Sequence, residues 1–292
     1  MDNAMIERWN TTVAEDDTVW HLGDFGFRLG EARAAAGFYQ RYLGLGYPLD
    51  SILIAGGARP VIYGIYRALL DPGDVVVYPV PSWNNNHYIH LLEAVPVECQ
   101  TRPEDGFMPT AKSLAPLVKG ARLLCLNSPL NPTGTVLSEA ELRRICELVL
   151  DENHRRAASG EKPLFVMYDQ VDYALTFGAV HHYTPPQLMP EMAAYTVFVD
   201  AISKSLCATG LRVGWAVAPP YITARMRDIL GHVGAWAPRA EQLAAAEILR
   251  DEKVLSDFHV VMKSEVQQRL DMLHQGFAVH FWHVVVGDHE VK

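Results

Sequence analysis

Residues 51–80 read SILIAGGARPVIYGIYRALLDPGDVVVYPV, and this stretch indicates the class of fold. An apolar run that predicts a strand is followed by Gly56-Gly57 and then by a predicted helix over residues 59–70. The turn residues Asp71-Pro72-Gly73 end that helix, and the apolar run 74–80 predicts a second strand. A strand, a helix and a strand in close succession are typical of an α/β domain.

The same alternation continues along the chain. Near-continuous apolar runs predict further strands at 94–100, 122–128, 164–169, 195–203 and 212–218. Helices are predicted at 31–43, 138–153, 221–233 and 238–250. The helix at 138–153 opens with Ser138 and Glu141 in a capping-box pattern. Because the strands scarcely alternate with polar residues, we expect helices to cover both faces of a mostly parallel mixed sheet, in three α/β/α layers.

The composition excludes several classes of protein. The chain has 292 residues, of which 49% are hydrophobic and 20% charged, as in ordinary globular domains. Its 25 Lys and Arg against 34 Asp and Glu give a net charge of −9, and no basic run suggests a nucleic-acid partner. No run approaches the roughly 18 apolar residues of a membrane-spanning helix, and the polar N-terminus does not resemble a signal peptide.

The cysteines and the C-terminal histidines do not indicate a metal site. The four cysteines form no C-x-x-C pair, so we expect reduced, buried thiols in a cytoplasmic protein. Residues 251–275 predict one polar, amphipathic helix, and residues 276–292 predict a short strand or a frayed end. The histidines in that last stretch lack carboxylates at ligand spacing, so no metal ligand is predicted there.

The most informative titratable residue is Lys204, which directly follows a predicted buried strand. An amine at a buried strand end is costly unless it is deprotonated, paired or used covalently. Arg212 follows eight residues later between Gly210 and Gly214, which permit close approach of the backbone. This pair suits an aldehyde cofactor that carries a phosphate, although a solvated lysine and a structural arginine would explain the pair alone.

Other polar or glycine-rich segments also follow predicted strands. Gly57 and Ala58 join a strand to a helix, where free backbone N–H groups make an anion site. Trp83, Asn131 and Asp169 each end or follow another strand. Because the carboxyl ends of parallel strands meet at one edge of the sheet, these residues are predicted to converge there. A core tryptophan, a turn asparagine and a capping aspartate remain the alternatives for the three residues taken singly.

Four segments resemble one known family and occur in that family's order. They are GGARPVIYGIYRALLDPGDVVVYPVPSW, NSPLNPTG, YDQVDYALTFG and SKSLCATGLRVGW, within about residues 20–250. The set resembles the class I/II aminotransferases, which are fold-type I pyridoxal-phosphate enzymes. The resemblance implies an N-terminal arm over 1–30, a large cofactor-binding α/β domain over 31–235 and a reduced small C-terminal domain over 236–292.

The resemblance also implies pyridoxal 5'-phosphate as cofactor and a role for each matched residue. Lys204 would form the Schiff base and move the proton, while Asp169 would pair with the pyridine nitrogen. Asn131 would donate to the phenolic oxygen, and Trp83 would stack on the ring. The phosphate would be held by Gly57, Ala58 and Arg212, with Ser203 or Thr209 as additional donors.

The sequence departs from the family pattern at three places. Asp172 stands where the family usually has a tyrosine, so either Tyr173 takes that place or Asn131 works alone. Ala201 stands where a phosphate-binding serine is common. The chain is also short at both ends relative to the family, and the arginine that would bind the substrate carboxylate cannot be named.

The implied activity is transfer of an amino group between an amino acid and a 2-oxo acid, in a homodimer. A lyase or decarboxylase of the same fold is an alternative within the class. A non-catalytic paralogue that binds the cofactor is an alternative outside it, which the intact Lys204 and Asp169 disfavour.

Overall fold

The computed structural model describes the backbone of residues 29–287, and seven strands of this part form one sheet. The order across the sheet is β1-β7-β6-β5-β4-β2-β3. The strands are β1 Ile52–Ala55, β2 Val75–Val80, β3 Val95–Gln100, β4 Ala121–Asn127, β5 Phe165–Asp169, β6 Thr196–Ala201 and β7 Gly214–Val217. All seven predicted strands are therefore present. β7 runs antiparallel to both β1 and β6, and the other six strands of the sheet share one direction, so they end at the same edge.

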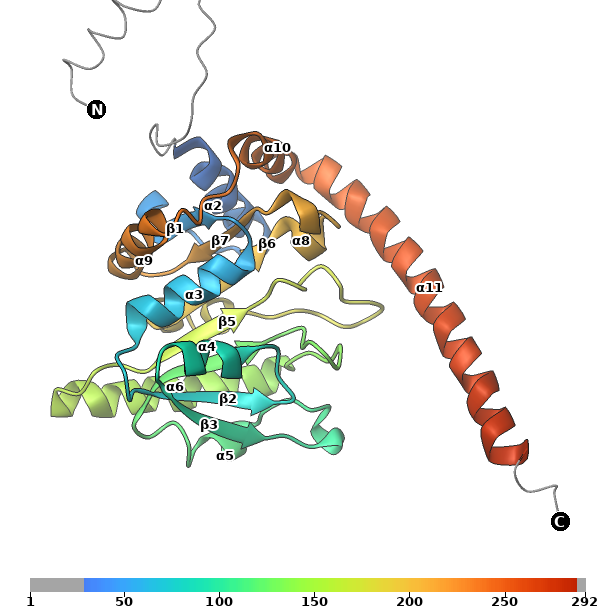
Figure 1. Ribbon diagram of the computed structural model, residues 1–292, viewed down its shortest axis with the longest axis horizontal. Coiled ribbons are helices and arrows are strands. Elements are labelled where there is room, and N and C mark those ends of the chain that lie inside the picture. Colours follow the sequence, from blue (N-terminus) through green and yellow to red (C-terminus); the bar gives the residue numbers. More distant parts are fainter. Residues whose placement is uncertain (1–28, 288–292) are drawn as a thin grey trace, which may run out of the picture.

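Helices cover both faces of this sheet, and the three-layer α/β/α prediction is confirmed (Figure 1). One face packs against α3 (Ala58–Leu69), α4 (Asn85–Leu91) and α9 (Pro220–His232). The elements on the other face are α2 (Leu29–Leu43), α5 (Ala111–Leu114), α6 (Glu139–Ser159), α7 (Pro185–Leu188) and α10 (Arg239–Arg250).

The central strands are buried on both sides, as their apolar sequence predicted. Successive side chains of β5 enter opposite cores: Phe165 and Met167 pack toward α3 and α9, whereas Val166 and Tyr168 pack toward α2 and α6. Every residue of β5 is buried, including the carboxylate of Asp169 at its end. The buried strand therefore places the polar side chain of Asp169 at the edge of the sheet.

The predicted capping box at the start of α6 forms only in part. The Ser138 hydroxyl accepts the N–H of Glu141 at 3.2 Å, as expected. The Glu141 carboxylate instead accepts the N–H of Ala111 at 2.7 Å, which connects α6 to the first turn of α5. The Glu141 carboxylate therefore accepts from the N–H of Ala111, which tertiary packing brings near, and not from the N–H of Ser138 as a capping box requires.

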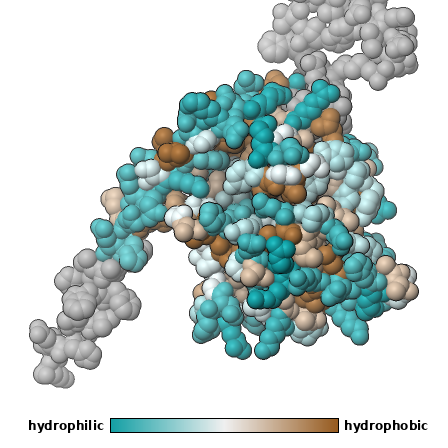
Figure 2. Space-filling view, turned by 180° about the vertical axis from the view of Figure 1, so that it is seen from behind, coloured by the Kyte–Doolittle hydropathy of each residue, from teal (hydrophilic) through white to brown (hydrophobic). Residues whose placement is uncertain are grey.

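The C-terminal part of the described chain consists of α10 and α11 (Glu252–Gly287), and α11 projects from the body of the molecule (Figure 1). Buried side chains of both helices, Ala246 and Leu249 of α10 and Leu255 of α11, join the core cluster that contains α2 and α6. Most of the visible surface of α11 is hydrophilic (Figure 2). The prediction of a separate domain beginning at residue 236 stays a prediction.

The prediction of a strand or frayed end from residue 276 is wrong as far as residue 287, because α11 continues there. A helix satisfies its own backbone hydrogen bonds, whereas a strand at this place would need a partner strand. No proline interrupts residues 252–287. Residues 1–28 and 288–292 lie outside the described part, and with them almost all of the predicted N-terminal arm.

The cysteines are free, and three of them are buried as predicted. Cys207 is exposed, which contradicts the prediction that all four are buried, because it lies in the turn after α8 (Ile202–Ser205) at the sheet edge. Within the described residues, no helix has the length and apolar character to cross a membrane. The same residues contain no group of three or more His, Cys, Asp or Glu arranged to bind a metal ion.

Candidate active site

The residues singled out from the sequence come together at the edge where the six parallel strands end. Gly57 follows β1, Trp83 follows β2, Asn131 follows β4, Asp169 ends β5 and Lys204 follows β6. Gly214 at the start of β7 pairs with both Ala55 and Ala201, because β7 runs in the opposite direction. Arg212, just before β7, therefore reaches the same edge.

Gly57, Arg212 and the start of α3 form a compact anion cradle. The Arg212 guanidinium donates to the carbonyl oxygens of Gly56 at 3.1 Å and Thr209 at 2.8 Å. Gly57 has φ +100°, and a Cβ there would lie 2.8 Å from Cζ of Arg212. A Cβ on Gly214 would lie 2.6 Å from the carbonyl carbon of Gly57, so both glycines are required by close approach. α3 begins directly after Gly57 without a side-chain cap, so the N–H groups of Ala58 and Arg59 in its first turn are available to an anion.

Asp169 presents a buried carboxylate at the same edge of the sheet as the cradle. It is 8% exposed, and its Oδ1 accepts the N–H of Val171 at 3.1 Å. Burial raises the pKa of Asp169 to about 7, the Val171 N–H opposes this shift and the charge of Asp172 adds to it. No Lys or Arg among residues 32–275 forms an ion pair with Asp169. A cation bound next to it would therefore be strongly favoured.

Lys204 lies in the one-turn helix α8 with its side chain exposed. Ser203 is buried, and its carbonyl oxygen accepts the Thr209 hydroxyl at 3.0 Å. This bond fixes the turn between Lys204 and Arg212. An exposed amine at this edge can reach a bound molecule, which a core lysine could not do.

Trp83 lies in the loop between β2 and α4, half-buried against the cluster that contains α3. The guanidinium carbon of Arg59 lies 5.2 Å from the centre of the Trp83 ring, which is a cation–π contact. Arg59 was not identified as a site residue from the sequence, where it is only the first residue of the helix predicted over residues 59–70. Its position two residues after Gly57 was the one available signal.

Asn131 is exposed in the loop after β4, and its backbone N–H is bound by a neighbour that sequence reasoning did not identify. The side chain of Asn127 accepts that N–H at 2.8 Å and donates to the backbone oxygen of Asp169 at 3.0 Å. Asn127 is the last residue of β4 and stands opposite Asp169 in the parallel register. A polar residue ending a predicted strand was a signal available in the sequence.

The side chains of the neighbouring residues Asp172 and Tyr173 have different surroundings in the structure. The Tyr173 side chain is buried in the core, with its ring 5.6 Å from Phe38 and 5.0 Å from Tyr42. Asp172 is half-buried, burial raises its pKa and the positive charge of Lys204 lowers it. Of the two residues, it is therefore Asp172 whose charge acts on the site lysine.

A second buried carboxylate, Asp200, lies on the opposite side of the sheet and was also not identified from the sequence. It is 0% exposed and accepts from the Tyr39 hydroxyl at 3.2 Å and the Gln170 amide at 3.1 Å. Gln170 also contacts His182 at 3.2 Å. Burial raises the pKa of Asp200 to about 7, against the opposing effect of these hydrogen bonds.

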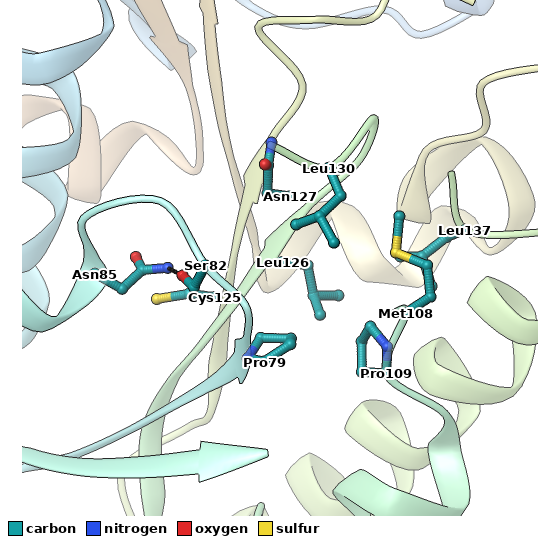
Figure 3. Close-up of a pocket in the computed structure, with 10 residues that line it drawn as sticks. All are labelled: Pro79, Ser82, Asn85, Met108, Pro109, Cys125, Leu126, Asn127, Leu130 and Leu137. Atoms are coloured by element: carbon teal, nitrogen blue, oxygen red, sulfur yellow. Dashed lines mark hydrogen bonds between the residues drawn. The ribbon is translucent and has the colours of Figure 1, made fainter. Parts of the chain in front are cut away.

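A small, mainly apolar pocket lies between the Trp83 loop and the Asn131 loop (Figure 3). Ser82 and Asn85 are joined by a 2.6 Å hydrogen bond on one side of it, and Asn127 lies at its upper edge in this view. The Tyr66 hydroxyl of α3 donates to Asn85 at 3.1 Å and contacts the Cys125 sulfur at 3.2 Å. These bonds connect the helix of the anion cradle to the segment that carries Trp83.

Comparison with known proteins places these features in one family. Residues 32–289 match the profile of the family described as aminotransferase class I and II. The aspartate aminotransferase of Rhizobium meliloti (strain 1021) is 30% identical over 240 residues, which are 82% of this chain and 56% of that protein. A probable aspartate/prephenate aminotransferase of Thermus aquaticus is 27% identical over 84% of this chain and 61% of its own length.

Solved structures agree with this placement. The crystal structure of the aspartate aminotransferase from Rhizobium meliloti superposes with a TM-score of 0.77 at 28% identity, covering 86% of this chain and 60% of that one. The aromatic aminotransferase from Pyrococcus horikoshii gives a TM-score of 0.78 at 26% identity, covering 90% of this chain and 66% of that one. The chain thus spans somewhat more than half the length of the curated relatives it matches.

Proposed function

Because the chain belongs to the class I and II aminotransferase family, we propose that it moves an amino group between an amino acid and a 2-oxo acid. The observation that carries this proposal is the meeting of an anion cradle, a buried carboxylate and an exposed lysine at one sheet edge. Aminotransferases of this family use pyridoxal 5'-phosphate as cofactor.

The residues of the site fit that cofactor in two respects. The space over Gly57 and the Arg212 guanidinium suit a phosphate, which a side chain at residue 57 would displace. The buried Asp169 has no cationic partner in the described chain and suits a protonated pyridine nitrogen. When bound, the cofactor supplies an aldehyde for amines and a ring that accepts the electron pair released at the substrate Cα.

The chain itself would bind, orient and transfer protons. Lys204 would bond the aldehyde at rest and then carry a proton to and from the substrate carbon. Ionised Asp169 would keep the ring nitrogen protonated, because a buried negative charge favours a neighbouring positive one. Trp83 would cover one ring face, and Asn131 would donate to the phenolic oxygen. Ala58 would contribute its N–H to the phosphate, with Ser203 as a further phosphate donor.

We propose substrates of the kinds named for the relatives, namely aspartate, asparagine and aromatic amino acids with their 2-oxo acids. Arg59 supports anionic substrates, because its exposed guanidinium lies beside the Trp83 ring. A homodimer in the cytoplasm is also proposed. Free thiols support the compartment, and exposed Tyr42 and Leu243 on the adjacent helices α2 and α10 support association.

The test is an absorbance spectrum of the protein with pyridoxal 5'-phosphate, before and after an amino-acid mixture is added. We expect a cofactor band that Lys204→Ala abolishes and that amino acids convert to the band of the amine form. Lys119→Ala, which removes an exposed lysine elsewhere, controls for non-specific reaction and should leave the band unchanged. The absence of any Lys204-dependent band would overturn the proposal.

Asp172 favours a second candidate, a cofactor-binding protein without turnover. Its half-buried carboxylate stands close enough to Lys204 for their charges to interact, and it would repel a phenolate. A Lys204-dependent band that ignores every amino acid would select this candidate. Release of carbon dioxide or a cleaved side chain, in place of a 2-oxo acid, would instead select a lyase or decarboxylase.

A further inference from the structure

The side chain of Asn127 lies between the two residues assigned to the cofactor ring. Its Nδ2 donates to the backbone oxygen of Asp169 at 3.0 Å, and its Oδ1 accepts the backbone N–H of Asn131 at 2.8 Å. Asp169 is the last residue of β5, whereas Asn131 lies in the loop after β4. A single amide group therefore bridges the two residues directly.

The chemistry of the two partners requires an amide at this place. A backbone oxygen only accepts and a backbone N–H only donates, so the orientation of the Asn127 amide is unambiguous. An ionised aspartate would keep the acceptor for Asn131 but would place a negative oxygen against the Asp169 carbonyl. An apolar side chain would supply neither bond.

The position of the Asp169 carboxylate depends on the backbone that Asn127 holds. In the described structure, the one hydrogen bond of the Asp169 carboxylate comes from the N–H of Val171, only two residues along the chain. The Asp169 carbonyl oxygen accepts a further bond from the N–H of Ser128 at 3.0 Å, which continues the β4–β5 pairing. A shift of this backbone would therefore move the carboxylate with it.

The Asn131 loop is closed at its other end by its own backbone. The Leu130 N–H donates to Thr135 at 2.8 Å, and the Gly134 N–H donates to Leu130 at 2.7 Å. These bonds shape the turn but do not join it to β5. Asn127, at the rim of the pocket in Figure 3, makes that connection through its side chain, in addition to the backbone bond from Ser128.

We propose that Asn127 is a positioning residue that holds Asp169 and Asn131 at the separation needed to bind the two polar atoms of the cofactor ring. This inference rests on the proposed function. Asn127 does not itself touch the ring; it acts through the two residues that would.

The chain offers a closely matched control in Asn153 of α6. Its side chain also bridges two backbone groups, donating to the Leu164 oxygen at 2.9 Å and accepting the Leu164 N–H at 2.7 Å. Leu164 directly precedes β5, so Asn153 acts on the opposite end of the strand that ends at Asp169. It is buried and lies away from the candidate site.

The experiment compares Asn127→Asp with Asn153→Asp by titration with pyridoxal 5'-phosphate and by thermal unfolding without cofactor. We expect Asn127→Asp to raise the cofactor dissociation constant by about tenfold or more, as loss of a hydrogen bond with added repulsion implies. The absorbance maximum of the cofactor bound to Asn127→Asp should also shift, and the pH dependence of its spectrum should change, because protonation of the ring nitrogen depends on Asp169.

The control variant Asn153→Asp should lower the unfolding temperature at least as much as Asn127→Asp does. Its cofactor dissociation constant should stay within about twofold of wild type. If Asn153→Asp does not fold, Asn153→Ala and Asn127→Ala form the pair.

Two results would overturn the inference. One is a wild-type dissociation constant and spectrum in Asn127→Asp. The other is an equal loss of affinity in both variants, which would assign Asn127 to general stability. Hydrogen exchange without cofactor tests the bridge separately: Asn127→Ala should speed exchange of the Asn131 N–H by about tenfold, whereas Asn127→Asp should not. If wild type shows no Lys204-dependent band, the proposed function fails, and unchanged Asn131 exchange in Asn127→Ala would remove the bridge as well.

Discussion

The guanidinium of Arg212 fills the space in which a side chain at Gly57 would begin. A Cβ on Gly57 would lie 2.8 Å from Cζ and 3.2 Å from Nη1 of Arg212, closer than unbonded atoms pack. The two residues are brought together by β7, which pairs with β1 so that Gly214 faces Ala55. The anion cradle therefore depends on a glycine and an arginine that are far apart in the sequence.

Gly57→Ala should abolish measurable cofactor binding, because the new Cβ displaces Arg212 from the cradle. Gly73→Ala is the matched control: Gly73 also has positive φ, at +86°, but nothing lies within 4 Å of its Cβ position. Both variants should lose roughly 1–3 kcal/mol of stability from backbone strain. Equal cofactor affinity in the two variants would show that the cradle does not bind the phosphate.

Arg212→Lys should weaken cofactor binding by about tenfold while keeping the charge, because an ammonium group cannot donate in a planar fork. The dissociation constant is measured by fluorescence titration. Arg225→Lys, an exposed arginine of α9, should leave it unchanged. A wild-type constant in Arg212→Lys would indicate that only charge, and not fork geometry, matters at this position.

The free energy of unfolding of Asp200→Asn should increase relative to that of wild type as the pH rises. Burial raises the pKa of Asp200 from 3.8 to about 7, so its protonated form is favoured in the folded protein. The stability it contributes is complete below pH 3.8 and is lost as the pH rises to about 7.

The measurement is urea unfolding of cofactor-free protein between pH 4 and 8. The difference in unfolding free energy between Asp200→Asn and wild type should grow by roughly 1 kcal/mol per pH unit up to about pH 7 and then level off. Asp169 is present in both proteins, so its own titration largely cancels. Asp228→Asn, at an exposed position on α9, should show no such trend, and a flat difference for Asp200→Asn would contradict the prediction.

Tyr66→Phe should cost about 1–2 kcal/mol of stability, because it leaves the buried Asn85 oxygen without its donor. Tyr78→Phe removes a hydroxyl that donates to the exposed Glu98 at 3.1 Å, where water can replace it, and should cost about 0.5 kcal/mol or less. Denaturant midpoints compare the two. A larger loss in Tyr78→Phe would show that the Tyr66–Asn85 bond is not a principal support of the Trp83 loop.

The local pattern of the sequence was sufficient for the strands and for most of the long helices. Apolar runs such as 164–169 and 195–203 became β5 and β6 because burial on both faces leaves little choice of residue type. The convergence of Gly57, Asp169 and Lys204 also followed, since parallel strands end at a common edge. The extent of α11 beyond residue 275 did not follow, because apolar residues without clear periodicity suit either helix or strand.

What the sequence by itself determined is the order of strands and helices and the set of chemically active residues at the strand ends. Only the tertiary structure decided which neighbours those residues have: Arg59 against Trp83, Asn127 between Asp169 and Asn131, and Tyr173 in the core while Asp172 interacts with Lys204. Secondary structure follows from spacing along the chain, which any reader of the sequence can see. Contacts between side chains on different strands depend on register and packing across the sheet, which local spacing does not contain.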